Sequence, residues 1–282
     1  MNSETDSDEI KLSAPATTSN IIEEPILEPE REKESEKNLE EDKKQDLEPE
    51  LEQESLDIQF TALKSSIKNN IPFYLVLLGC LYYFTINTNS SNSFNKRTFF
   101  NLLISFIVMS FLGVIIHYIS HKITITNIYE QFKLEKGNML TRNKTLDKIF
   151  KAGCRLFDFH STTHHDSHIN KAPINIFYEF INNACTQGLL LLLTKTILNF
   201  LDSRIIVLWA FLYATLHNIN YLYIKPITHA QHHIKEITNY GIDIWDIILN
   251  TKYDWTHIES HNHYAINIII LSGLIVKYLN KI

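Results

Sequence analysis

Cysteine, glycine and proline are all scarce in this sequence of 282 residues, which has three cysteines, seven glycines and seven prolines. Cys80, Cys154 and Cys185 are isolated and odd in number, so the sequence indicates neither a disulfide framework nor a thiolate metal site. It also has no phosphate loop, dinucleotide fingerprint or nucleophile elbow, which excludes the enzyme classes that depend on them. Any metal in this protein must therefore be held by nitrogen or oxygen.

Charge is distributed unevenly along the chain. Residues 1–60 hold 20 of the 32 acidic residues and 6 of the 26 basic ones, so their net charge is −14 and that of the remainder is +8. Because this segment has almost no aromatic residue, it cannot bury enough apolar surface to offset the entropy lost on ordering it. We expect residues 1–65 to be a disordered acidic tail and residues 66–282 to form the folded domain. No secretory signal is recognisable, because the first apolar run begins near Ile71.

Long apolar runs predict an all-α integral membrane protein. Ile71–Ile86 and Thr98–Ser120 are expected to form one helical hairpin, and Gly188–Phe200 with Arg204–Ile224 a second. The last run, Ala265–Leu279, is short, which leaves a spanning, a re-entrant and an interfacial position all open. We therefore expect about four transmembrane helices in two hairpins of the same polarity, which place their histidine-bearing ends on one membrane face.

Lysines favour the cytosol for that face and for the N-terminal tail, because basic residues collect on the cytosolic side of membrane helices. Lys96 and Arg97 lie on the opposite side and weigh against this orientation. The lysines that flank the histidine-bearing face are Lys64, Lys68, Lys122, Lys133, Lys136 and Lys225.

Thirteen histidines are many for this length, and nine of them follow a pattern suited to metal binding. Residues three or four apart share one face of a helix, so the imidazoles of each histidine cluster can bind the same metal ion. A third histidine adjacent to such a pair lies about 100° around the helix and could bind a second metal. Nine imidazoles exceed what one ion can bind, so two metals are the simplest interpretation. The candidate ligands are His117 and His121 (HYISH), His160, His164 and His165 (HSTTHH), His217, and His229, His232 and His233 (HAQHH).

Other interpretations of single histidines stay open at this point. His217 alone would be an ordinary hydrogen-bonded side chain near a helix end. The segment His257–His261 is no zinc-protease motif, because Glu259 stands one position too late for HExxH. His257, His261 and His263 are expected to be a surface cluster rather than neighbours of the metal ligands.

The segment that follows the last histidine cluster carries a family resemblance. The run HAQHHIKEITNYGIDIWDIILNTKYD places Asn239-Tyr240-Gly241 and then Trp245-Asp246 after HxxHH. In this succession, and in its earlier HxxxH and HxxxHH motifs, the chain resembles the fatty acid hydroxylase and sterol desaturase superfamily over residues 98–255. It departs from the family at Asn250, where relatives have glycine, and in the longer interval between His121 and His160. Where some relatives carry a histidine pair, this chain has His217 and Tyr221, and His168 could supply the missing ligand.

The resemblance implies a membrane-bound oxygenase that hydroxylates or desaturates a lipid. The family fold is a set of about four membrane helices under a cytosolic helical cap, with the nine histidines binding two iron ions, although zinc could occupy the isolated protein. Dioxygen would be the oxidant, and an external carrier such as cytochrome b5 with its reductase would supply electrons. Asn239 and Asp246 would orient the ligands. Fatty acyl, sphingoid and sterol substrates remain open, the expected location is the endoplasmic reticulum, and no nucleic-acid partner is expected.

A second hypothesis treats the protein as a histidine-rich metal carrier or sensor of the membrane. Transporters usually place polar ligands near the middle of the membrane, between helices. Here the clusters fall at helix ends, which favours the oxygenase. A degenerate family member with a purely structural role is disfavoured by the intact histidine pairs.

Overall fold

The computed structural model describes residues 53–88, 93–136, 143–165, 172–193, 199–235 and 237–279. Over these ranges the chain is built from helices and turns and contains no strand, which confirms the predicted all-α class. Residues 1–52 of the expected acidic tail and the alternative ligand His168 lie outside the described residues.

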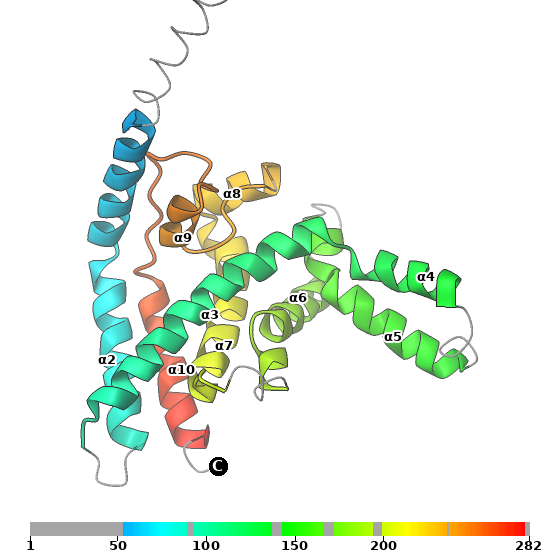
Figure 1. Ribbon diagram of the computed structural model, residues 1–282, viewed down its shortest axis with the longest axis horizontal. Helices are drawn as coiled ribbons and strands as arrows, with labels where there is room; N and C mark the ends of the chain where they lie inside the picture. Colours follow the sequence, from blue (N-terminus) through cyan, green and yellow to red (C-terminus); the bar gives the residue numbers. More distant parts are fainter. Residues whose placement is uncertain are drawn as a thin grey trace, which may run out of the picture. The chain divides into compact units, whose positions relative to one another are not determined.

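The folded part centres on four apolar helices that lie side by side (Figure 1). They are α2 (Ile71–Thr88), α3 (Lys96–Lys122), α7 (Ser203–Ile219), which continues as the π-helix η3 (Asn220–Ile224), and α10 (Tyr264–Leu279). In the described ranges, α3 and the continuous helix Ser203–Ile224 are long and apolar enough to cross a membrane. The helix Gln53–Asn69 and α2 would add a third crossing if this pair, bent by 62°, forms one span.

Side chains from all four apolar helices meet in one core. Phe84 of α2, Met109 of α3, Leu208 of α7 and Ile268 of α10 are fully buried there. The outward positions of the same helices are also apolar, as Ile104 and other exposed residues show. Helices that are apolar all round are typical of membrane spans, where lipid covers the outer face.

The second predicted hairpin differs from the structure. In the described part of Gly188–Phe200, which is residues 188–193 and 199–200, the only helix is the four-residue 3-10 helix η2 (Leu189–Leu192). The helix that packs along α7 is instead α6 (Pro173–Thr186), which begins with its proline at the first turn. Hydropathy missed α6 because its buried face carries Glu179, Asn182 and Asn183.

A cap of short helices covers one end of the apolar helices. It contains α8 (Ile227–Ile234) and α9 (Asp243–Ile248), and the helix Gln53–Asn69 is bound to it: Gln59 Nε2 donates to the carbonyl of Ile247 at 2.6 Å. Residues 53–65, which the sequence assigned to the tail, are therefore helical and belong to the folded part.

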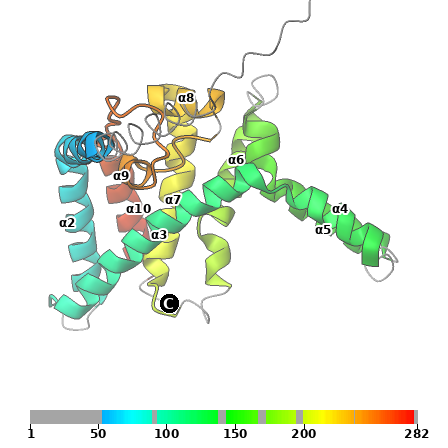
Figure 2. The ribbon, with the colours of Figure 1, turned by 45° about the horizontal axis from the view of Figure 1, so that its top comes forward.

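Two further helices, α4 (Ile125–Lys136) and α5 (Lys144–Phe157), form a hairpin that begins just after α3. It occupies the long interval between His121 and His160. Both Figure 1 and Figure 2 show the hairpin running away from α2, α7 and α10. The carboxylate of Asp158 accepts hydrogen bonds from the backbone nitrogens of Ile125 and Thr126, both at 2.7 Å, and so fixes the base of the hairpin. The π-helix η1 (His160–His164) follows directly.

Candidate metal centre

The nine histidines singled out in the sequence come together at the capped end of the helix bundle. Eight of them form three overlapping groups in which one nitrogen from each member lies within 4.8 Å of the others. His165 belongs to none of these groups, but its ring centroid lies 4.6 Å from that of His121 and 4.4 Å from that of His233. The three groups are His117, His121, His160 and His232; His160, His164 and His217; and His164, His229 and His233.

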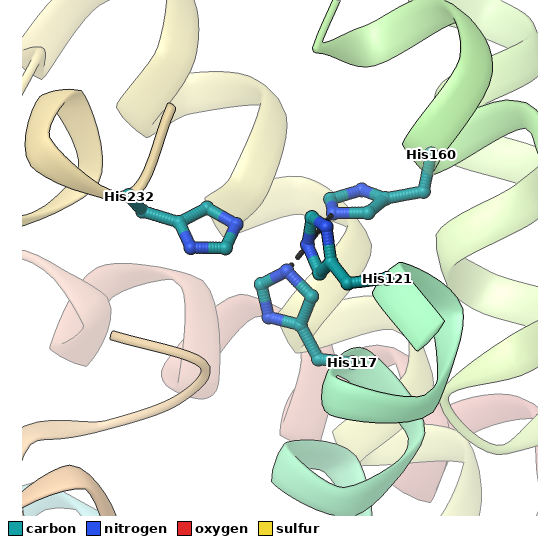
Figure 3. A group of neighbouring side chains, drawn as sticks. All are labelled: His117, His121, His160 and His232. Atoms are coloured by element: carbon teal, nitrogen blue, oxygen red, sulfur yellow. Dashed lines mark hydrogen bonds between the residues drawn. The ribbon is translucent and has the colours of Figure 1, made fainter. Parts of the chain in front are cut away.

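The first group joins three distant parts of the chain. His117 and His121 come from the end of α3, His160 from η1 and His232 from α8, and Figure 3 shows their rings facing a common point. The Nε2 atoms of His117 and His160 are 2.9 Å apart, and those of His160 and His121 are 3.3 Å apart. Nitrogens at these separations in a buried site either share a proton or surround a cation.

The other two groups extend the centre from η1 toward α7 and α8. The π-helical turn of η1 stacks the rings of His160 and His164, with centroids 5.1 Å apart. The Nε2 atom of His164 lies 2.9 Å from that of His217, and the Nε2 atoms of His229 and His233 are 3.1 Å apart. The centre is therefore elongated, with His160 and His164 shared between neighbouring groups.

Two backbone carbonyls orient the histidines of the first group. Nδ1 of His117 donates to the carbonyl of Tyr240 at 2.6 Å, and Nδ1 of His232 donates to the carbonyl of Thr238 at 2.6 Å. A carbonyl can only accept, so the proton of each neutral ring is on Nδ1 and the lone pair is on Nε2. Among the described residues Nε2 of His232 has no hydrogen-bond partner although the ring is fully buried. This arrangement is typical of a histidine that ligates a metal through Nε2.

Asp246 and Asn239 hold this carbonyl shelf, defined here as residues 238–241, rather than contacting the imidazoles. The Asp246 carboxylate accepts hydrogen bonds from the backbone nitrogens of Tyr240 at 2.8 Å and Gly241 at 3.0 Å. Asn239 adopts a φ of 54° and donates from Nδ2 to the carbonyl of Thr228, beside the start of α8. Asp246 and Asn239 could therefore orient the ligands only indirectly, by holding the backbone whose carbonyls accept hydrogen bonds from His117 and His232.

Glu179 is a member of the centre that the sequence did not predict. Its Oε1 lies 2.7 Å from Nδ1 of His164 and 3.1 Å from Nε2 of His217. A carboxylate on the distal nitrogen fixes the tautomer of a ligating histidine and makes it a better donor. One signal was present: Glu179 is the only acidic residue between Asp166 and Asp202.

Burial disfavours protonation of several imidazoles of the centre. It lowers the pKa of His160 and His229 well below the usual range, and neighbouring imidazoles lower them further. Burial also lowers the pKa of His232 and His233 to about 3. For Glu179 burial opposes ionisation, but hydrogen bonds from His164 and His217 outweigh it and lower the pKa to about 2. At neutral pH these four histidines therefore offer neutral nitrogen ligands, and Glu179 adds an anionic carboxylate.

A cavity of about 80 Å³ adjoins the centre between α3, α7 and the cap. Its walls include the histidines His117, His217 and His229, acidic residues such as Asp246, and apolar side chains such as Phe73, Leu212 and Leu216. The cavity therefore brings an apolar surface up to the histidine rings.

The C-terminal histidines lie outside the three groups. His261 is buried against Phe73 and Tyr264, which corrects the expectation that it belongs to a surface cluster. Its backbone nitrogen donates to Asn70 Oδ1 at 2.6 Å, and this contact brings its side chain inside the fold. His257 is exposed and pairs with Asp254 at 3.1 Å.

Comparisons with protein-family models, with curated proteins and with solved structures found no match for this chain.

Proposed function

We propose that the chain is a membrane-bound di-iron oxygenase that hydroxylates or desaturates a lipid, using dioxygen and electrons from an external donor. The observation that carries this proposal is the convergence of the nine histidines on one buried centre at the end of apolar helices. It is joined by the motif resemblance, which places HxxHH, Asn239-Tyr240-Gly241 and Trp245-Asp246 in the order that the fatty acid hydroxylase and sterol desaturase superfamily uses.

The residues fit a pair of metal ions. The lone pair on Nε2 of His232, buried without a protein partner among the described residues, and the nitrogen pairs at 2.9–3.3 Å are what a cation site requires. His117, His121, His160 and His232 would hold one ion, and His164, His217, His229 and His233 the other, with His165 between them. Neutral imidazole suits iron, copper and zinc. Iron with dioxygen supplies the oxidant that an unactivated C–H bond needs.

The protein's own groups position the reacting partners. Glu179 keeps His164 in one tautomer, and the carbonyl shelf does the same for His117 and His232. The apolar walls of the cavity, including Phe73 and Leu216, would hold a methylene group of the lipid beside the histidines and exclude water. Because the centre lies at the end of α3 and α7, the substrate's chain could remain in the bilayer while its reacting carbon enters the cavity.

We also propose that four helices cross the membrane, with the centre and the N-terminal tail facing the cytosol and the endoplasmic reticulum as the location. In this arrangement α2, α3, α6 and α7 are the spans. The helices α3 and α7 both end at the centre, so the chain between them must return across the membrane, and α6, which packs along α7, makes that return in place of Gly188–Phe200. The basic residues that follow the histidine-bearing end of α3, among them Lys122 and Lys133, support the cytosolic side. A separate cytochrome b5 with its reductase would then reach the centre from the cytosol.

A direct test is to express the chain, load the purified protein anaerobically with ferrous iron, and measure bound iron and oxygen uptake with and without added lipid. The proposal predicts two irons per chain and oxygen uptake that requires lipid. Without an electron donor this uptake should stop after about one turnover, because the ferrous pair supplies only two electrons, and an added donor should sustain it. A metal carrier would instead move iron or zinc across proteoliposomes and consume no oxygen. A chain that binds no metal would exclude both functions.

A further inference from the structure

The hairpin of α4 and α5 has a surface that the fold leaves uncovered. Its two helices are held together by Tyr129, which hydrogen-bonds Asp147 at 2.7 Å, and by the ion pairs Lys133–Asp147 at 3.0 Å and Lys151–Glu130 at 2.5 Å. Away from this contact, large apolar side chains point outward. They are Ile128 and Phe132 of α4 and Leu146, Ile149 and Phe150 of α5, and we call them the apolar stripe.

The helix α5 separates apolar and basic residues completely. Successive helical residues are turned by about 100°. Four cations at intervals of four, three and four residues therefore line one side, and the apolar residues of α5 line the opposite side. Ile149 on the apolar side is 61% exposed, a large value for so apolar a residue. The cations are Lys144, Lys148, Lys151 and Arg155.

The position of the hairpin indicates what covers the stripe. α3 ends at Lys122 and α4 begins at Ile125, so only two residues separate a membrane-spanning helix from the hairpin. Two residues extend over at most about 7 Å. The hairpin must therefore start at the level where α3 leaves the bilayer. Exposed apolar residues at the end of α3, Tyr118 and Ile119, continue through Ile123 to Ile128 of α4.

We propose that the α4–α5 hairpin lies in the interface of the membrane that α3 crosses, with the apolar stripe among the acyl chains. A helix with one apolar face and a Lys/Arg-rich polar face takes this position, with its apolar side about 5–10 Å below the headgroups. The basic side then faces headgroup phosphates and water. This inference rests on the proposed membrane crossing of α3, but it does not depend on metal or on catalysis.

Two adjacent residues of α5 provide a matched test. The three native cysteines are first replaced by alanine. A single cysteine is then introduced as Ile149→Cys or Lys148→Cys, and it carries a spin label in protein reconstituted into phosphatidylcholine nanodiscs. Collision rates with oxygen, which partitions into lipid, and with chromium oxalate, which stays in water, give the depth of each label. The label at 149 should collide mainly with oxygen and lie about 5–10 Å deep. The label at 148 should collide mainly with chromium oxalate.

Two results would overturn the inference. If both labels collide freely with chromium oxalate, the hairpin lies in water. If the label at 149 is shielded from both reagents, another protein surface or a second copy of the chain covers the stripe. Should the cysteine variants fail to fold, the unaltered chain can be cross-linked with phospholipids that carry a photoreactive acyl chain. Adducts on Ile149 or Phe150 support the inference, and adducts confined to spanning-helix positions such as Ile104 contradict it.

Discussion

Glu179 Oε1 lies 2.7 Å from Nδ1 of His164, which couples a carboxylate of α6 to a histidine of η1 at the middle of the centre. Glu179→Gln keeps the shape of the side chain and removes its charge. Loss of such a partner typically lowers metal affinity about 10–100-fold. Competition with a chelator should show that decrease for the purified variant. Glu135→Gln, an exposed position on α4, is the control and should bind metal as the unaltered chain does.

Gly241 lies against α3 so closely that a Cβ atom there would overlap Cγ2 of Val114. Gly241→Ala should therefore destabilise the protein by about 1–3 kcal/mol, the usual cost of overpacking. Val114→Ala removes the overlapping methyl groups. The double variant should melt at a higher temperature than the sum of the two single effects predicts, as measured by thermal unfolding in detergent. Additive effects would show that Gly241 is not constrained by this contact.

Asp246 should make stability depend on pH. Burial raises the pKa of this carboxyl to about 6, despite hydrogen bonds from Thr251 and the backbone of Gly241 and Tyr240. An unfolded aspartate titrates near 4, so between about pH 4 and 6 the native state holds a proton that the unfolded state releases. This contribution to the free energy of unfolding is therefore present at low pH and is lost as the pH rises.

The matched variant for that effect is Asp246→Asn, which cannot titrate. From pH 4 to pH 7 the free energy of unfolding of the unaltered chain should fall by on the order of 2–3 kcal/mol relative to that of the variant. This is the equivalent of a shift of about two pKa units. Unfolding temperatures of both metal-depleted proteins across this range measure the difference. A difference that stays constant with pH would mean that folding does not raise the pKa of Asp246.

His232 and His261 are both buried, but only His232 belongs to a histidine group. His232→Ala should therefore lower the amount of bound metal. His261→Ala should leave it unchanged and lower only the unfolding temperature, because the ring packs against Phe73 and Tyr264. Metal analysis of the two purified variants compares them directly. Equal metal loss in both would mean that the fold, not the ligand, controls binding.

Local patterns of the sequence predicted the histidine clusters because helical spacing is a local property. His117 with His121 and His229 with His233 share a face whatever surrounds them. His217 stands alone in the sequence, so no local pattern indicated that it is a ligand. It contacts His164 and Glu179 in the fold, where α6 packs on α7, and no local pattern encodes that packing.

Tertiary contacts also explain what hydropathy did not predict. Gly188–Phe200 is apolar enough to suggest a span, but its described part has only the short helix η2. Glu179 is 15 residues from His164 in the sequence, and only the fold makes them neighbours. The sequence predicted a role for Asp246 but not its hydrogen-bond partners. The backbone nitrogens of Tyr240 and Gly241 reach its carboxylate only in the folded conformation of residues 238–241.

The most direct test of the central claim is mass spectrometry of lipid extracts from cells that express either the unaltered chain or the His164→Ala, His165→Ala double variant. An oxygenase predicts a lipid that gains one oxygen or loses two hydrogens with the unaltered chain and does neither with the variant. Identical lipid profiles from both, with the protein present in the membrane and loaded with metal, would contradict the proposed function.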